Sequence, residues 1–74
     1  MSYKYDKLLG RITEVFGTQE KFAKALGMSP QTLSYKLNNK VDWRRDEIKR
    51  ACELLSINFG EVGTYFFTLK IKIS

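Results

Sequence analysis

One stretch of twenty residues that begins at Thr18, TQEKFAKALGMSPQTLSYKL, restricts the fold more than any other part of the chain. It holds two helix-start signals, Thr18 and the pair Ser29 and Pro30, which combine a capping hydroxyl with a preset backbone angle. Gly27 lies between them and accepts the left-handed backbone that ends a helix. The pattern therefore predicts two short helices joined by a tight turn. Their expected ranges are about 19–26 and 30–38.

Two short helices with such a turn match the helix-turn-helix unit, in which the first helix braces the second. In DNA-binding versions the second helix enters the major groove with its N-terminal residues against the bases. Leu33 and Leu37 are then expected to point into the core, which leaves a short polar outer face. The side chains of that face that can meet bases are Pro30, Gln31, Ser34 and Tyr35.

A second set of residues is suited to contact the DNA backbone. Amides at the two helix starts can bind phosphate oxygens, and basic or amide side chains just past the second helix can fix its register. The candidates are Thr18, Gln19, Ser29, Asn38, Asn39, Lys40, Arg44 and Arg45. A plain solvent-exposed face on a small helical bundle explains the same polar residues, and the two arginines can instead pair with acidic neighbours.

The rest of the chain predicts further helices around this unit. Apolar residues between Tyr5 and Phe16 recur with the three–four spacing of one helix face, and the segment WRRDEIKRACELLSI carries a second such stripe. The start of this second helix is not sharply defined, and Asp42 is a candidate cap. Asn58 and Glu61 resemble a capping box before a short fifth helix over VGTYFF.

The spacing of apolar residues changes near the C-terminus. Apolar and polar residues alternate there, as in a half-buried strand, so we expect a strand at about 67–74. Its partner is either the SYKY segment near the N-terminus or a strand from another molecule, in which case the apolar side chains form a dimer or partner contact. These side chains are Phe67, Leu69, Ile71 and Ile73. Phe66 and Phe67 are also expected to fill the core.

Composition excludes several classes of function. The 74 residues predict one domain, and with one cysteine and no histidine we expect no enzymatic activity, cofactor, metal or small-molecule substrate. That residue, Cys52, lies on an apolar stripe and is expected to be inert. No apolar run approaches the roughly 20 residues of a membrane span, and no secretory signal is visible, so a cytoplasmic location is expected. The net charge of +5 favours a polyanionic partner.

The stretch TQEKFAKALGMSPQTLSYKLNN resembles the helix-turn-helix of phage repressors of the Cro and CI type, over about residues 11–57. The whole chain is similar to small Cro-like proteins from phages and prophages of Gram-positive bacteria. This resemblance implies a mainly α, lambda-repressor-like fold of five helices and, as a dimer, binding to double-stranded operator DNA. It also implies that Gln19 and Asn39 grip phosphates, and that Gln31, Ser34 and Tyr35 meet bases.

Pro30 departs from the family pattern, because many relatives carry a polar residue there that can reach a base. Direct readout is therefore expected to be sparse, with an apolar contact such as a thymine methyl in its place. The alternative function is that of an antirepressor or modulator of repression. Such a protein keeps this fold and binds a CI-type repressor protein.

Overall fold

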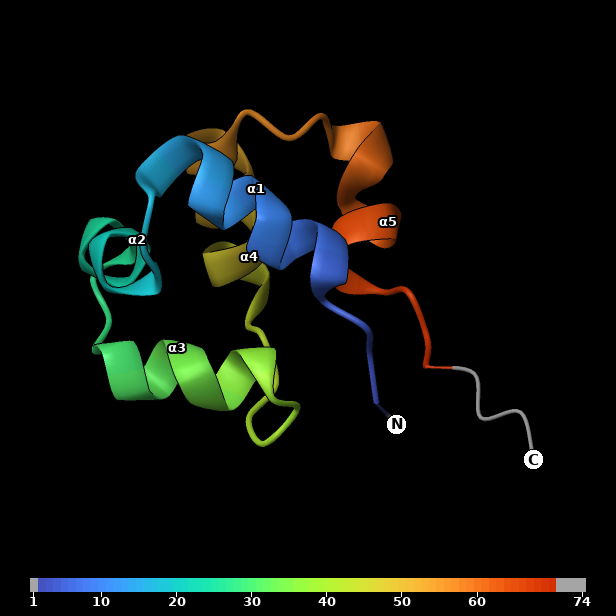
Figure 1. The fold of residues 1–74 in the computed structure, drawn as a ribbon. Helices are drawn as coiled ribbons and strands as arrows, with labels where there is room; N and C mark the ends of the chain where they lie inside the picture. The colour runs from blue at the N-terminus through green and yellow to red at the C-terminus, as the bar shows by residue number, and fades with distance from the viewer. Residues whose placement is uncertain (1, 71–74) are drawn as a thin grey trace.

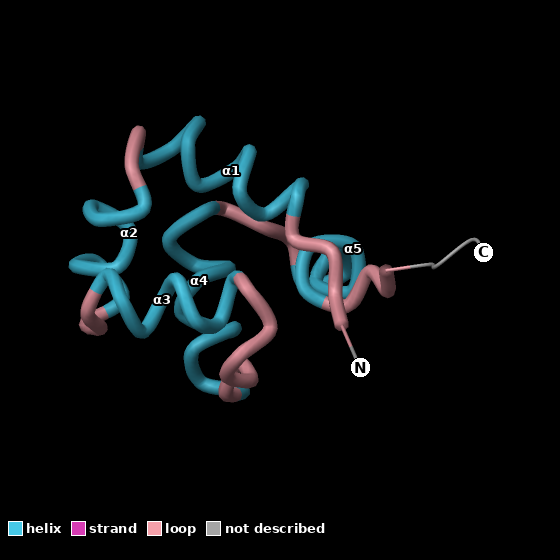
Figure 2. Tube along the Cα trace, turned by 60° about the horizontal axis from the view of Figure 1, so that its bottom comes forward, coloured by secondary structure: helices cyan, strands magenta, loops and turns pink. Residues whose placement is uncertain are grey.

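The computed structural model describes residues 2–70, and these form a mainly helical bundle (Figure 1). Its elements are α1 (Asp6–Phe16), α2 (Gln19–Leu26), α3 (Pro30–Leu37), α4 (Arg45–Leu55), the 3₁₀ helix η1 (Phe59–Glu61) and α5 (Val62–Phe66). Helix α1 packs against α2, α4 and α5, and α2 also contacts α3 and α4 (Figures 1 and 2). Within residues 2–70, no helix is long and apolar enough to cross a membrane. The prediction of a mainly α fold is confirmed.

Local caps set the limits of α2 and α3 where the sequence predicts them. The Thr18 hydroxyl accepts the backbone N–H of Lys21 at 3.2 Å at the start of α2, and Gly27 ends this helix with φ of 81°. The Ser29 hydroxyl then accepts the backbone N–H of Thr32 at 3.1 Å and caps α3. The two short helices and the turn between them are therefore confirmed as structure.

The core gathers one or two large apolar side chains from every α-helix. The largest fully buried side chains are Phe22, Phe66, Leu8, Ile12, Leu33 and Leu55. Phe66 packs edge-on against Trp43, with 5.1 Å between the ring centroids, as expected for a core residue. The same expectation for Phe67 is wrong, because α5 ends at Phe66 and the next side chain leaves the core-facing side with 49% of its surface exposed.

Two predicted caps are also wrong. Helix α4 begins after Arg44, whose backbone N–H donates to the Glu47 carboxylate at 2.8 Å, so Asp42 lies too far upstream to cap it. Asn58 makes no side-chain cap bond. The 3₁₀ turn instead closes through the backbone, because the N–H of Glu61 donates to the carbonyl of Asn58 at 2.8 Å.

The predicted C-terminal strand is not confirmed. Among residues 2–70, the tail forms a single antiparallel bridge, between Tyr3 and Leu69. The Lys4 N–H donates to the Thr68 carbonyl at 2.6 Å, and the Lys70 N–H donates to the Ser2 carbonyl at 3.2 Å. Within the described residues this pairing is a single bridge, and it uses the SYKY segment that the sequence offered as one partner. Two members of the predicted strand, Ile71 and Ile73, lie outside the described residues.

Candidate functional site

The outer face of α3 carries the residues predicted to meet bases. Pro30 and Gln31 are exposed, Tyr35 is 40% exposed and Ser34 is half-buried. Leu33 on the opposite side of the helix is fully buried, which confirms the predicted orientation of α3. The contact of these residues with DNA stays a prediction.

Polar side chains of this face already bond to one another. Gln31 Nε2 donates to Tyr35 Oη at 2.8 Å, and Asn38 Nδ2 donates to the Ser34 carbonyl at 2.8 Å. The Lys40 ammonium lies 5.7 Å from the centroid of the Tyr35 ring, within the range of a cation–π contact. The Gln31 Oε1, its second N–H and the Tyr35 O–H are not used by the bond between these two residues, so both can still bond to a base or a phosphate.

The residues predicted to contact phosphates lie in three places. Thr18, Gln19 and Ser29 are exposed at the starts of α2 and α3. Asn38, Asn39 and Lys40 follow α3, and Arg44 and Arg45 are exposed at the start of α4. The structure leaves most of these side chains exposed, and their role toward DNA stays a prediction.

Asn39 differs from the rest of this set because its amide holds the N-terminal segment. Its Oδ1 accepts the Tyr3 N–H at 2.8 Å, and its Nδ2 donates to the Tyr3 carbonyl at 3.0 Å. The residue also has φ of 62°, a left-handed conformation that asparagine tolerates better than most residues. In this structure the side chain therefore connects the loop after α3 to the N-terminal segment, and only its second Nδ2 N–H is left to donate to a phosphate.

Sequence reasoning missed a buried ion pair that ties α3 to α4. Lys36 is only 3% exposed, and its Nζ lies 2.8 Å from Glu47 Oε1 and donates to the Asp42 carbonyl at 2.9 Å. The same Glu47 carboxylate caps α4, so one acidic group serves both purposes. The signal was available, because Lys36 lies three residues after the buried Leu33 and therefore on the inward side of α3.

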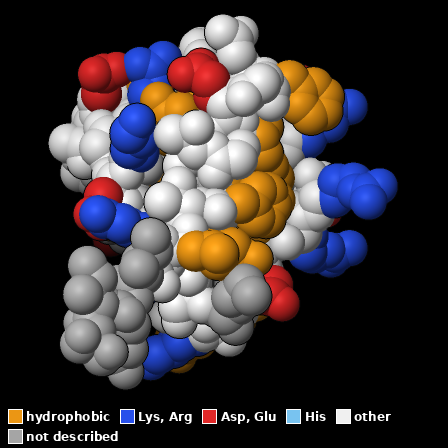
Figure 3. All heavy atoms as spheres, turned by 90° about the vertical axis from the view of Figure 1, so that its right-hand side faces the viewer, with side chains coloured by type: hydrophobic (Ala, Val, Ile, Leu, Met, Phe, Trp, Pro, Cys, Tyr) orange, Lys and Arg blue, Asp and Glu red, His pale blue; other side chains and the backbone are white. Residues whose placement is uncertain are grey.

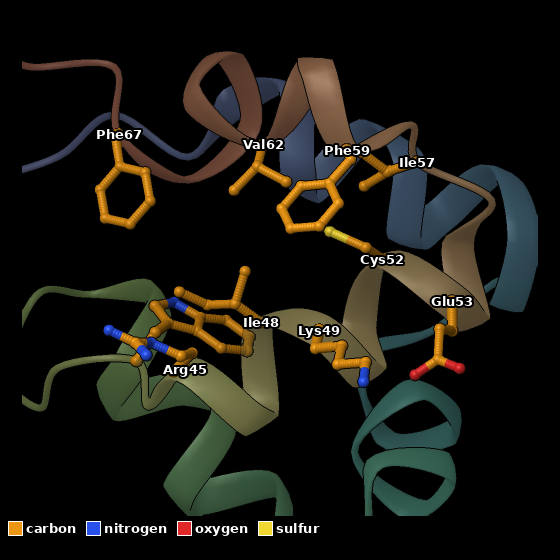
Figure 4. Close-up of a pocket in the computed structure, with 10 residues that line it drawn as sticks. Arg45, Ile48, Lys49, Cys52, Glu53, Ile57, Phe59, Val62 and Phe67 are labelled. Carbon is orange, nitrogen blue, oxygen red and sulfur yellow. The ribbon is translucent and has the colours of Figure 1, made fainter.

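A second surface, which the sequence did not predict, is a cleft of about 900 Å³ between α4 and the η1–α5 segment, called here the α4–α5 cleft. Its apolar lining is Trp43, Ile48, Cys52, Ile57, Phe59, Val62 and Phe67, and its charged lining is Arg45, Lys49 and Glu53. Figure 4 shows Phe59, Val62 and Phe67 on one side, directed toward Ile48 and Cys52 of α4. No residue of α2 or α3 lines it, so the cleft is separate from the outer face of α3.

The α4–α5 cleft forms part of an exposed apolar patch. Phe59 is 94% exposed, and Phe67 and Leu69 are also exposed. The space-filling view shows apolar side chains in a band over this face, with Lys and Arg side chains projecting along one side of it (Figure 3). A contiguous exposed apolar patch with a polar rim is typical of a binding surface for another molecule.

Two groups in the cleft report on its environment. Burial raises the pKa of the Cys52 thiol, so the sulfur is protonated and weakly nucleophilic at neutral pH, in agreement with the expectation that it is inert. The indole N–H of Trp43 is buried and has no acceptor among the described residues. The chemistry of the α4–α5 cleft is therefore that of an apolar binding surface, and no arrangement of reactive groups lies in it.

The fold is a small helical bundle with a capped α2–α3 unit and two candidate surfaces. Residues 1–69 match the family model described as "Protein of unknown function (DUF739)", and the chain belongs to this family. It is also similar to the solution structure of the modulator of repression (MOR) of the temperate bacteriophage TP901-1 from Lactococcus lactis. The identity is 50%, the match covers 97% of each chain, and the TM-score is 0.81. No curated protein matches the chain.

These findings support the resemblance to phage regulators in its broader part. They confirm the broader class, a phage regulator-like protein, and connect the chain to a repression modulator. The narrower assignment to the DNA-binding Cro and CI type is not confirmed.

Proposed function

We propose that this protein regulates repression indirectly, as a modulator that binds a CI-type repressor protein. The observation that carries the proposal is its similarity to a modulator of repression, at 50% identity over 97% of both chains. A match of this extent includes both the α2–α3 unit and the α4–α5 cleft. It supports a shared mode of action more strongly than a shared helix-turn-helix pattern, which many DNA-binding proteins carry.

The chemistry of the two surfaces favours a protein partner. Several polar groups of the α3 face are engaged within the chain, as the pairs of Gln31 with Tyr35 and of Asn39 with Tyr3 show. The α4–α5 cleft offers apolar area that water covers when it is empty, and Phe59 supplies much of it. Removal of such area from water drives protein association, whereas most contacts to DNA go to charged phosphates.

Titration of this protein with the purified CI-type repressor of the same phage or prophage tests the proposal. Isothermal calorimetry should give saturable binding, and the two proteins should elute together from a size-exclusion column. In a mobility-shift assay the mixture should change the repressor–operator band, while this protein alone should leave operator DNA unshifted. Separate elution together with no heat of binding would contradict the proposal.

A second candidate is transcription regulation by direct binding of operator DNA as a dimer, through α3. It is favoured by the exposed Gln31 and Tyr35 on α3 and the exposed Lys40 beyond it. In that case Gln31→Ala weakens binding to the specific site by about 1–3 kcal/mol, and Lys40→Ala lowers affinity for all sequences and flattens the salt dependence. Lys7→Ala, at an exposed position of α1, is the matched control. If wild type binds the operator and both α3-side variants bind it equally well, this candidate is wrong.

A further inference from the structure

We infer that the α4–α5 cleft receives an amphipathic helix of the repressor, and that this helix carries two acidic residues and one basic residue, in register with the charges of α4, beside its apolar stripe. The inference rests on the proposed function and names both the surface of this protein and the chemistry of the segment that binds it. Four features of the cleft support it: its apolar floor, its overhanging phenylalanine, the order of charges on its rim and its separation from α3.

The apolar residues that α4 contributes to the cleft are spaced as they are on one face of a helix, which suits contact with a second helix. Ile48 and Cys52 lie four residues apart on α4, so they stack on one face of it, and Val62 and Phe67 oppose them from the α5 side (Figure 4). Recognition of a helix in a groove uses apolar residues at positions i, i+3 or i+4, and i+7 of the bound helix. The cleft volume of about 900 Å³ leaves room for side chains from such a stripe.

Phe59 lies at the edge of the cleft and is not packed into the core. Its side chain is 94% exposed, although the neighbouring Ile57 is buried in the core. An isolated exposed phenylalanine needs no explanation, but this one borders an apolar cleft and extends its surface outward. A partner helix laid along α4 would cover the ring, and Phe59 is the residue whose burial changes most between the free and bound protein.

The rim of the cleft carries charges in a fixed order. Arg45, Lys49 and Glu53 follow one another at every fourth residue of α4, so they form one row beside the apolar floor. None of the three takes part in a salt bridge among the described residues, whereas Lys36, Arg44 and Glu47 nearby are engaged. Along α4 the row therefore has two positive charges followed by one negative charge. It favours a partner that places two acidic groups and one basic group opposite them.

A second copy of this chain fits the row less well. Two copies in parallel oppose like charges along the whole row. Two antiparallel copies pair Arg45 with Glu53 at each end but place Lys49 against its own copy at the two-fold axis. Like charges brought together at an interface oppose binding, and the net charge of +5 adds to this repulsion. A repressor helix with complementary charges meets none of these penalties.

Calorimetry with the purified CI-type repressor and four variants of this protein tests the inference. Phe59→Ser and Lys49→Glu change exposed side chains of the cleft, and each should weaken repressor binding at least tenfold. Val15→Ser, at an exposed apolar position of α1 outside the cleft, and Lys7→Glu, an exposed charge reversal on α1, should bind within twofold of wild type. Circular dichroism should show the same helix content for all four variants.

A charge-swap experiment tests the order of charges independently of the apolar floor. For Lys49→Glu, replacement of one acidic residue on the repressor helix by lysine should restore at least half of the lost binding free energy. If wild type binds the repressor but Phe59→Ser and Lys49→Glu bind equally well, the cleft inference is overturned and the proposed function stands. If wild type does not bind at all, both fail. If Phe59→Ser only breaks a dimer seen by sedimentation, the cleft serves self-association and the inference is wrong.

Discussion

Replacement of Glu47 by glutamine tests whether the buried ion pair fixes α3 against α4. The change keeps the size of the side chain and an amide oxygen that can accept the Arg44 N–H, so the cap of α4 remains. It removes the negative charge that lies 2.8 Å from Lys36 Nζ. The lysine then stays in a site that is only 3% exposed, with the neutral amide oxygen and the Asp42 carbonyl as acceptors but without its counter-charge.

The cost follows from the burial of each partner. Removal of one member of a buried ion pair costs about 3–5 kcal/mol, because the other charge is left buried and unpaired. The Glu47 side chain is 20% exposed, so water reaches the edge of the site and the cost should lie near about 3 kcal/mol. Lys36→Met leaves instead a carboxylate that water reaches and the Arg44 N–H still satisfies, so its cost should be about 1 kcal/mol. The double variant should lose less free energy of unfolding than the two single variants lose when their losses are added.

Urea unfolding, followed by helical circular dichroism, measures these differences. A loss of 3 kcal/mol is a large share of the total for a domain of this size, roughly 4–11 kcal/mol, and should lower the midpoint by about 1–3 M urea. Asp46→Asn breaks an exposed pair with Arg44, in which the closest atoms are 3.7 Å apart, and should change stability by less than about 1 kcal/mol. Equal losses for Glu47→Gln and Lys36→Met would refute the assignment of the cost to an unpaired buried lysine.

Three further predictions concern single groups. Asn39→Ala removes both bonds to Tyr3 and places a Cβ without an amide at φ of 62°, so thermal unfolding should show a loss of about 2–3 kcal/mol, with Asn39→Gly losing less. Burial, with smaller contributions from Tyr3 and Asp42, raises the pKa of Tyr5 above 10.0, so the neutral phenol favours the folded state. This contribution to the free energy of unfolding is complete below pH 10.0 and declines as the pH rises toward the folded pKa. In urea unfolding, Tyr5→Phe should therefore become more stable relative to wild type only above pH 10.0. A stability difference that does not change with pH would contradict this. Because burial raises the pKa of the Cys52 thiol, iodoacetamide should alkylate it more slowly than a free thiol at about pH 8, and urea should abolish the protection.

The parts of the fold that the sequence predicted depend on local chemistry. Thr18, Gly27 and Ser29 act within three or four residues of their own positions, so their types alone define the ends of α2 and the start of α3. The core followed from helical periodicity for the same reason. At the start of α4, the local pattern did not show that Asp42 supplies a backbone carbonyl to Lys36 and no cap.

The parts that the sequence did not predict depend on pairs of distant segments. The α4–α5 cleft exists because α5 stands beside α4 with Phe59 left outside, and an apolar residue type does not reveal whether its side chain is buried. The amide of Asn39 was free to be assigned to a phosphate until the structure placed Tyr3 against it, 36 residues away in the chain. Alternation in the tail likewise predicted a strand without showing that, within residues 2–70, it pairs with the N-terminal segment through a single bridge.

The same distinction explains how one fold accommodates a reader of DNA and a binder of proteins. The residues that produce the helix-turn-helix pattern are caps and core residues, such as Ser29 and Leu33, and they are needed for either function. The residues that give the α4–α5 cleft its character, such as Phe59 and Lys49, are exposed and bear little on whether the bundle folds. If the α4–α5 cleft binds the partner as proposed, a change of partner requires new side chains on α4 and η1 while the core stays as it is. For this reason the α2–α3 pattern predicts the architecture well and leaves open which of its surfaces binds the partner.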